Sequence, residues 1–502
     1  MKYIDNIRKV LFMLCLCALL MPACTDDFED LNTNPNEPEL VPPGTIFPYA
    51  IREGIDRIHG HRTRLERLGL DGGMLWVQYF ARNQYTNEGD TYNPDASMRN
   101  NNWEGFYTES LINFQKVIDI TGDVENEFYN PNFLAAATIM REYLFSVVTD
   151  TWGAVPYVEA LQGATTGNLA PGYTDQETIY LSMLDNLQIA AETLDPAGDP
   201  ITGDILFSGD ITRWQKFANS LRLRLANRMA AQKPTEAAAV FSQIMGDPAS
   251  YPIFTSNDDF AVLIHESRLN DNNNNAWHEI MIFDGREDWS ISNRLIAAMT
   301  DGAGNAIDPR LEVYAEPAIA GDLAGGYAGA VNGLPEALAS VYINTASRPG
   351  SYFTQEKGPV FIMTYSELLF ILAEAALDGE YTGGLTAQEY MDQAVAASFG
   401  QYDLEMPADY LGTLTLDKPT LMTEKWKAMF SQGVEAWSEY RRTGFPVLSE
   451  AAPEAIFANN GQVPTRLRYP ESEYSLNGAN VEAGAALNGG ADDKLTKLWW
   501  AE

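Results

Sequence analysis

Cysteine is scarce in this chain: its 502 residues include only Cys15, Cys17 and Cys24. Everything after residue 24 therefore lacks a thiol, which excludes a disulfide framework, a thiolate metal cluster and a cysteine nucleophile there. Long apolar runs are also missing, because no segment beyond the first 23 residues approaches the about 20 continuous apolar residues of a membrane-spanning helix. The bulk of the chain must therefore derive its stability from a hydrophobic core.

Basic residues are few as well. The chain has 33 Lys and Arg against 69 Asp and Glu, a formal net charge of −36. A surface this acidic repels nucleic acid, so nucleic-acid binding is excluded. The same charge disfavours strongly anionic ligands unless a local basic pocket receives them.

The first residues have the pattern of an export signal. Lys2, Arg8 and Lys9 precede an apolar run over residues 10–21, and a small residue comes before Cys24. These are the n-region, the h-region and the cleavage site of a signal peptide. A cysteine directly after the cut resembles the lipobox of bacterial lipoproteins, although Met21 is slightly unusual at its position. The resemblance implies cleavage before Cys24 and lipidation of its thiol; the alternative is an ordinary signal with a chance cysteine.

The segment after Cys24 is predicted to be a tether. Residues 26–30 are acidic apart from Phe28, and Thr33–Pro48 is rich in proline, which favours an extended chain. Acidic residues after the anchor also resemble the surface-export tag of some Gram-negative lipoproteins. The predicted organisation is a signal peptide over 1–23, a lipid anchor and tether over 24–48, and one large domain over 49–502.

Helical periodicity dominates that domain. Six helices are predicted, at about residues 132–149, 174–194, 214–229, 364–377, 386–399 and 423–442. Capping boxes begin three of them, at Thr174, Thr364 and Thr386. The paired helices indicate a mainly α fold with tetratricopeptide-like hairpins, although no clean 34-residue period is present. Long polar inserts interrupt the helices, at about 69–102, 160–173, 256–290, 302–358 and 451–494.

Several strings, taken in order, resemble the SusD/RagB family of outer-membrane nutrient-binding lipoproteins, in its SusD-like branch. The most recognisable is DTWGAVPYVEAL at 150–161. Others are DFEDLNTNPNEP at 27–38, residues 214–228, MTYSELLFILAEAA at 363–376, KWKAMFSQGVEAWSEYRRTGFP at 425–446, PTRLRYPESEY at 464–474 and KLWW at 497–500. They cover nearly the whole chain. Most have physical roles in packing, so Trp152 and Tyr157 are expected in the core, and Arg224 and Arg228 in pairs with acids.

The resemblance implies a function as well as a fold. It implies a lipid-anchored, surface-exposed protein of the outer membrane that binds an oligomeric nutrient, which we take to be an oligosaccharide, and delivers it to a SusC-like TonB-dependent transporter. It implies no enzymatic activity and no cofactor. A peptide ligand is the alternative within the family, a surface glycan hydrolase is a second class, and a purely structural lid for the transporter is a third.

Metal motifs are incomplete in this sequence. His265-Glu266 and His278-Glu279 each begin a zinc-protease motif but lack its second histidine. The stretch from Asp271 starts like a calcium loop but lacks the turn glycine, which leaves only a looser oxygen-ligand calcium site open. No metal ligands are therefore predicted.

Aromatic and amide side chains crowd two inserts, as in sugar-binding sites, where rings cover the C–H face and polar groups bind the hydroxyls. The ligand-binding candidates are Tyr79, Asn83, Tyr85, Trp103, Trp277 and Trp289. We predict that Asn83 and Tyr85 from the first insert meet Trp277 and Trp289 from the second in one exposed site, since binding residues concentrate on loops. The alternative is that these aromatic residues are core, as the helical spacing of Trp76, Tyr79 and Phe80 suggests.

Overall fold

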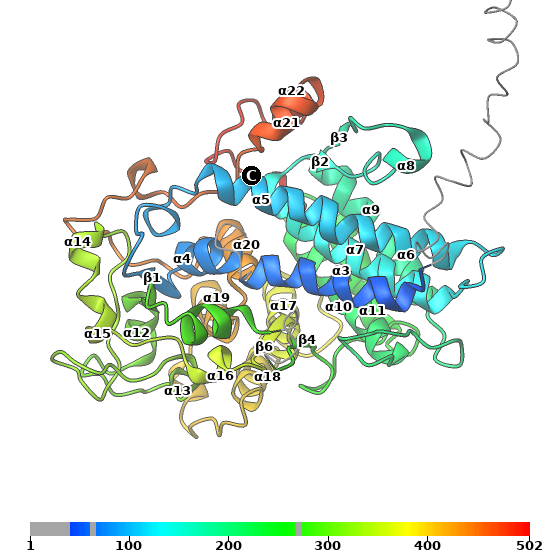
Figure 1. Ribbon diagram of the computed structural model, residues 1–502. Coiled ribbons are helices and arrows are strands. Elements are labelled where there is room, and N and C mark those ends of the chain that lie inside the picture. The colour runs from blue at the N-terminus through cyan, green and yellow to red at the C-terminus, as the bar shows by residue number, and fades with distance from the viewer. Residues whose placement is uncertain (1–40, 61–66, 268–273, 502) are drawn as a thin grey trace, which may run out of the picture. The chain divides into compact units, whose positions relative to one another are not determined.

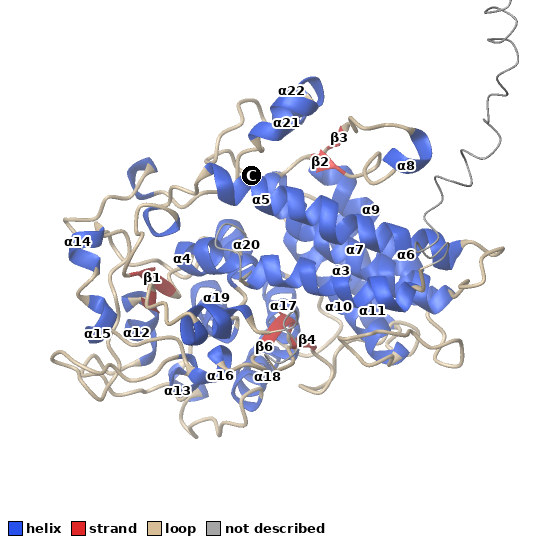
Figure 2. Cartoon of the chain, viewed as in Figure 1, coloured by secondary structure: helices blue, strands red, loops and turns tan. Residues whose placement is uncertain are grey.

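The computed structural model describes residues 41–60, 67–267 and 274–501 (Figure 1). Helices make up most of this part, and the strands form three two-stranded pairs (Figure 2). Pro43–Glu502 form one compact unit. The predicted mainly α fold in one large domain is confirmed.

In the described part of the chain, ten helices of more than ten residues form the scaffold. They are α3 (Pro43–His59), α6 (Ile112–Gly122), α7 (Pro131–Trp152), α9 (Gln176–Thr193), α10 (Ile211–Met229), α11 (Pro234–Gly246), α17 (Tyr365–Asp378), α18 (Ala387–Gly400), α19 (Lys418–Ala428) and α20 (Gly433–Thr443). Neighbours in the chain pack as hairpins: α6 on α7, α9 on α7 and α10, α10 on α11, and α17 on α18. This is the tetratricopeptide-like arrangement that the periodicity predicted.

Shorter elements fill the inserts. The helices are α4 (Met74–Trp76), α5 (Ala96–Gly105), α8 (Gly163–Thr166), α12 (Asn293–Met299), α13 (Leu311–Tyr314), α14 (Glu336–Ala339), α15 (Tyr342–Thr345), α16 (Ser351–Thr354), α21 (Glu471–Leu476) and α22 (Gly478–Leu487). Single π-helical turns include η1 (Gly69–Gly73), η3 (Phe106–Leu111) and η4 (His278–Phe283). The antiparallel strand pairs are β1 (Phe80–Arg82) with β5 (Trp289–Ile291), β2 (Val155–Pro156) with β3 (Tyr173–Thr174), and β4 (Ala261–Ile264) with β6 (Pro359–Met363).

Local capping chemistry begins and ends the long helices as expected. The side chains of Thr364 and Thr386 accept hydrogen bonds from the third residue of α17 and α18, and Thr386 completes a capping box. Gly444 ends α20 at φ +76°, the left-handed conformation of a C-terminal cap. At α9 the predicted cap is wrong by one residue, because Asp175 rather than Thr174 accepts from the helix.

The helix predicted over 423–442 is broken in two. Its chain turns at Ser431, which has φ +77°, and α20 starts afresh at Gly433. A Cβ on Gly433 would lie 2.6 Å from the backbone nitrogen of Met74, so only glycine permits this approach. The break therefore brings α20 against η1 and α4, a contact that no local pattern encodes.

A buried ionic cluster joins helices from both halves of the chain. Arg228 on α10 donates to Asp150 at the end of α7, at 2.6 Å, and pairs with Glu435 and Glu439 on α20. Burial alone would raise the pKa of Glu435, but the neighbouring guanidinium groups hold it below its ordinary value. Arg228 is 2% exposed. The predicted pairing of this residue with acids is thus confirmed, and it fixes α7, α10 and α20 to one another.

The boundary of the tether shifts in the structure. Helix α3 begins at Pro43, so the predicted extended segment does not reach Pro48, which lies inside the helix. Residues 1–40, including Cys24, lie outside the described part of the chain. Among the described helices, none has the length and apolar character to cross a bilayer.

Candidate functional site

The inserts at about 69–102 and 256–290, which hold Tyr85 and Trp289, meet at a short antiparallel ladder. Strand β1 pairs with β5, and the next residue, Asn83, donates its backbone N–H to Asp288 O at 2.7 Å. The Asn83 side chain donates to Glu287 O and to Ser290 Oγ, at 3.1 and 2.8 Å. Asn83 is only 1% exposed, so it positions the two loops.

Tyr85 stands at the turn that follows β1. Its φ is +54°, and its backbone N–H donates to Glu336 Oε2 on α14 at 2.9 Å. The Arg286 guanidinium lies over its ring, with Cζ 5.3 Å from the centroid. Tyr85 is 39% exposed, which makes it an aromatic ring held at the surface by contacts on both sides.

A pocket of about 150 Å³ is lined by Arg286, the same residue whose guanidinium lies over the Tyr85 ring. Trp289 forms part of the pocket wall, with the Arg82 guanidinium 4.7 Å from its centroid. The buried indole N–H of Trp289 has no hydrogen-bond partner among the described residues. Such a donor costs free energy unless a ligand oxygen or a water accepts from it.

Charged groups of both signs surround the pocket. Arg286 donates through Nη2 to Asp288 at 2.6 Å, and Arg348 pairs with Glu287. Partial burial alone would lower the pKa of Arg286, but its hydrogen bonds to Asp288 and Tyr85 raise it. Guanidinium and carboxylate groups can donate to and accept from the hydroxyls of a neutral ligand.

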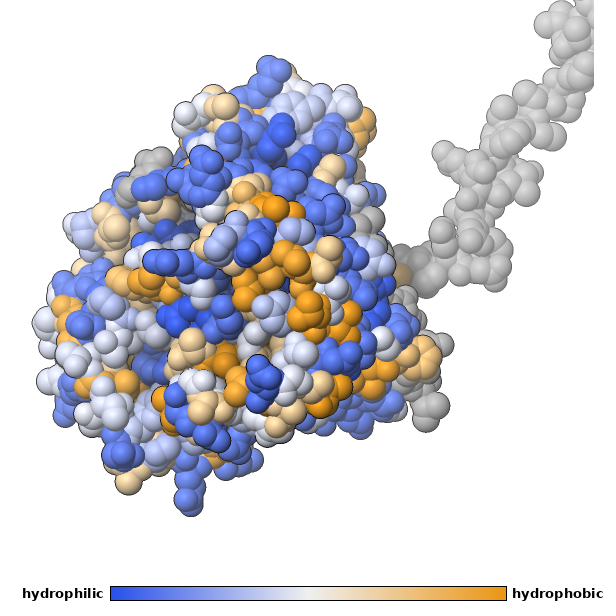
Figure 3. All heavy atoms as spheres, turned by 90° about the vertical axis from the view of Figure 1, so that its left-hand side faces the viewer, coloured by the Kyte–Doolittle hydropathy of each residue, from blue (hydrophilic) through white to orange (hydrophobic). Residues whose placement is uncertain are grey.

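Apolar side chains extend the site across the surface. On η4, Ile282 and Phe283 are 57% and 54% exposed. Figure 3 shows the side of the molecule that carries β1, α14 and α15, and apolar side chains form patches there between polar ones. An apolar surface bordered by fixed polar groups matches a ligand with one apolar face and a hydroxyl rim.

Comparison with known proteins gives the family. A profile described as "starch-binding associating with outer membrane" matches residues 35–470. The chain belongs to the SusD-like family. Members of this family are non-catalytic glycan-binding proteins associated with the outer membrane, so this SusD-like protein is a binding protein and not an enzyme.

Solved structures agree with the profile. A chitin-binding protein is 27% identical, with a TM-score of 0.77 over 92% of this chain and 100% of its own. A chitin-binding SusD homolog from Flavobacterium johnsoniae (23% identity, TM-score 0.78, 91% and 98% covered) and a SusD homolog from Bacteroides uniformis (23%, 0.77, 91% and 99%) share the fold. No curated protein matches the chain.

Two of the candidate residues lie in the core of this SusD-like protein: the predicted exposure of Trp277 is wrong, and Tyr79 follows the core alternative. Trp277 is fully buried and stacks on His59, with centroids 4.4 Å apart. Tyr79 is also fully buried, stacks on Trp426 and donates its hydroxyl to the Trp426 carbonyl. Desolvation raises the pKa of Tyr79 well above its ordinary value.

The remaining candidates divide between two places. Tyr85, Asn83 and Trp289 lie together at the site, although Trp289 is only 2% exposed. Trp103 lies in a different pocket, formed with α21. Ile282 and Arg348 line the pocket and were not among the predicted site residues. The only sequence signal for Arg348 was its place in the insert at about 302–358. Contact of any of these residues with a ligand stays a prediction.

Metal ligands do not gather in the described part of this SusD-like protein: residues 41–60, 67–267 and 274–501 contain no group of three or more His, Cys, Asp or Glu side chains placed to hold an ion. Asp271, where a loose calcium site was left open, lies outside those ranges.

The buried carboxyl of Asp90, which Asn332 connects to β1, predicts a pH dependence. Asp90 accepts from Asn332 Nδ2 and from the Gly333 N–H, both at 2.8 Å, and desolvation raises its pKa to about 7. Because the folded-state pKa lies above the unfolded value, its contribution to stability is full below pH about 4 and declines as the pH rises to about 7, by up to about 1.4 kcal/mol per pH unit. Asp90→Asn should remove this decline. Thermal melts of both proteins from pH 4 to 8 should show a difference that grows in favour of the variant; parallel curves would contradict the assignment.

Proposed function

We propose that this protein is a lipid-anchored, cell-surface lipoprotein that binds an oligosaccharide at the site around Tyr85 and delivers it to a SusC-like TonB-dependent transporter. The observation that carries the proposal is the convergence of Tyr85, Arg286 and the Trp289 pocket on one apolar, polar-rimmed surface. Residues 1–23 are the signal peptide, Cys24 is the anchor, and the tether runs to the start of α3. Partnership with the transporter and the lipid anchor rest on the family and on the sequence before residue 41.

The chemistry of the site favours a neutral oligosaccharide. A sugar ring can lie against the exposed Tyr85 ring and the aliphatic surface of η4, while its hydroxyls bind Arg286 and the acids near it. The chitin-binding relatives make chito-oligosaccharides the first ligands to test. Titration calorimetry with chitotetraose, other glycans and a peptide mixture tests the ligand class. Binding of peptides and of no glycan would favour the peptide alternative.

Tyr85→Ala should weaken oligosaccharide binding about tenfold, because a stacked ring contributes on the order of 1 kcal/mol beyond its buried area. The variant keeps the backbone N–H that donates to Glu336, so its melting temperature should change little. Tyr85→Phe, which retains the ring, should bind within about twofold of the parent. The matched control is Tyr129→Ala, which removes a similarly exposed tyrosine (43%) from another part of the surface. Equal affinity of Tyr85→Ala and the parent for a confirmed ligand would remove Tyr85 from the site.

Cys24→Ala should abolish lipidation and release the protein from the outer membrane, because stable anchoring takes more than one acyl chain and this residue carries them all. The fold should be unaffected, because none of the described helices crosses a membrane and Cys24 lies outside the described residues. Fractionation and mass spectrometry of the mature N-terminus check this in cells that lack the transporter. Tight membrane association of the variant in those cells would defeat the idea.

A further inference from the structure

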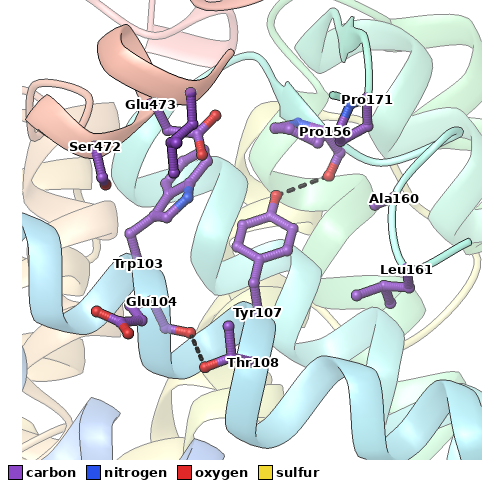
Figure 4. Close-up of a pocket in the computed structure, with 11 residues that line it drawn as sticks. Trp103, Glu104, Tyr107, Thr108, Pro156, Ala160, Leu161, Pro171, Ser472 and Glu473 are labelled. Carbon is purple, nitrogen blue, oxygen red and sulfur yellow. Dashed lines mark hydrogen bonds between the residues drawn. The ribbon is translucent and has the colours of Figure 1, made fainter. Parts of the chain in front are cut away.

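A second and larger pocket, of about 380 Å³, lies outside the site around Tyr85. Residues of α5 and η3 line it on one side, the chain between β2 and β3 on another, and α21 on a third (Figure 4). None of the residues that line the Trp289 pocket takes part in it. It is a separate feature of the molecule, to which the proposed glycan site assigns no role.

The floor of this pocket is a pair of aromatic rings held in place by the protein. Trp103 and Tyr107 have centroids 4.9 Å apart, and Trp103 packs edge-on against Trp152 at 5.3 Å. The Tyr107 hydroxyl donates to Pro156 O at 2.7 Å (Figure 4). The floor therefore exists without a ligand, so a ligand would not need to order it.

The walls and the surrounding surface are apolar. Leu161 and Leu476 line the pocket, and Leu476 is 80% exposed. The loop that forms one wall also exposes Val158 and Leu169, at 56% and 87%. Large exposed aliphatic side chains around an aromatic hollow are typical of a protein-docking surface.

The charge of the pocket is of one sign. Glu104 and Glu473 line it, and no Lys, Arg or His does. Tyr173 donates its hydroxyl to Glu473 Oε2 at 2.8 Å. Across the described ranges of the chain, neither carboxylate forms an ion pair with a basic side chain. Two carboxylates on a protein of net charge −36 favour a cationic ligand and repel an anionic one.

The polar groups of this pocket also distinguish it from a sugar site. Its lining contains no Asn, Gln or Arg side chain. The hydroxyls of a sugar would therefore find no amide or guanidinium group to bind in this pocket. An apolar side chain next to an ammonium or guanidinium group suits it better. A polypeptide segment supplies that combination when an aromatic or aliphatic residue has a basic neighbour.

We propose that this pocket is a docking site for a basic polypeptide segment, which inserts one aromatic or branched aliphatic side chain against Trp103 and Tyr107 and places an adjacent Lys or Arg near Glu104 and Glu473. The apolar anchor provides the buried contact, and the acidic rim selects the charge of the partner. The proposal is independent of the glycan site.

The test uses the mature chain and two peptides of opposite charge, acetyl-Lys-Trp-Lys-amide and acetyl-Glu-Trp-Glu-amide, titrated by calorimetry. We expect the basic peptide to bind at least tenfold more tightly than the acidic one. Glu104→Lys should weaken binding of the basic peptide about tenfold and strengthen binding of the acidic peptide. Glu125→Lys, a charge reversal at an exposed glutamate elsewhere, should change neither affinity. Failure of both peptides to bind, or equal affinities in all three proteins, overturns the proposal.

Two further experiments test the apolar contact of the pocket and the class of its ligand. Trp103 is buried, so the apolar contact is tested at the exposed Leu476 instead. Leu476→Ser should weaken binding of the basic peptide about threefold or more without lowering the melting temperature. Chitobiose with both amines free presents a cationic sugar. The disaccharide would overturn the polypeptide proposal if it bound the parent protein, if Glu104→Lys weakened that binding, and if the basic peptide did not bind. The pocket would then be assigned to amino sugars.

Discussion

Trp277→Ala is expected to lower the free energy of unfolding by about 4 kcal/mol. The indole is fully buried, stacks on His59, and has Phe80 and Phe353 at 5.3 and 6.2 Å. Its removal leaves a large cavity among rigid aromatic rings, and buried Trp or Phe to Ala changes typically cost about 3–5 kcal/mol. Denaturant unfolding followed by circular dichroism measures the change.

The control for Trp277 is an aromatic residue from the same segment. Phe283 lies six residues further on, at the end of η4, and is 54% exposed. Phe283→Ala should cost about 1 kcal/mol or less, since surface substitutions have small effects. A Trp277 variant as stable as the Phe283 variant would show that the indole is not core, and would reopen its role at the surface.

Arg228→Met is expected to cost about 3–5 kcal/mol, because it leaves Asp150 and Glu435 buried with one cation fewer. The loss should depend on pH. Arg228 helps to hold the folded-state pKa of Glu435 below its ordinary value, so this contribution is present above pH about 4.3 and is lost as the pH falls through the lower folded value. The stability deficit of the variant should therefore be largest near pH 7 and shrink below about pH 4.5.

Arg348→Met supplies the comparison for the buried arginine. Arg348 and Glu287 form an ion pair whose side chains are 38% and 43% exposed, and such pairs contribute about 1 kcal/mol or less. Urea melts of both variants at pH 4 and pH 7 separate the two cases. A deficit for Arg228→Met that stays constant with pH would contradict the electrostatic account.

The helices were predictable where their signals are local. Threonine caps at 364 and 386 and the glycine at 444 are contained in a few neighbouring residues, and each appears in the structure. The break at Ser431 was not predictable, because its cause is the close approach of Gly433 to Met74, more than 350 positions away in the chain. Periodicity continued across that point, and the packing overrode it.

The meeting of the two inserts was predictable, and the exposure of their residues was not. The sequence indicated that the two inserts converge, and the β1–β5 ladder joins them. Trp277 was predicted at the surface because it lies among polar loop residues, with asparagines directly before it in the sequence. In the structure Asn275 is itself fully buried and donates to the Phe353 and Gln355 carbonyls. Amides satisfy buried backbone as well as bound sugars, so polar neighbours do not establish exposure.

The short ladder between β1 and β5 constrains how the ligand preference of the protein can evolve. Arg286, Trp289 and Arg348 come from inserts, whereas Arg228 and its partners join long helices of the scaffold to one another. New ligand preferences can therefore arise when related proteins exchange these inserts, provided that β1 and β5 are exchanged together with the loops that they join. A graft of residues 83–87 alone would carry a tyrosine without the strand that positions it.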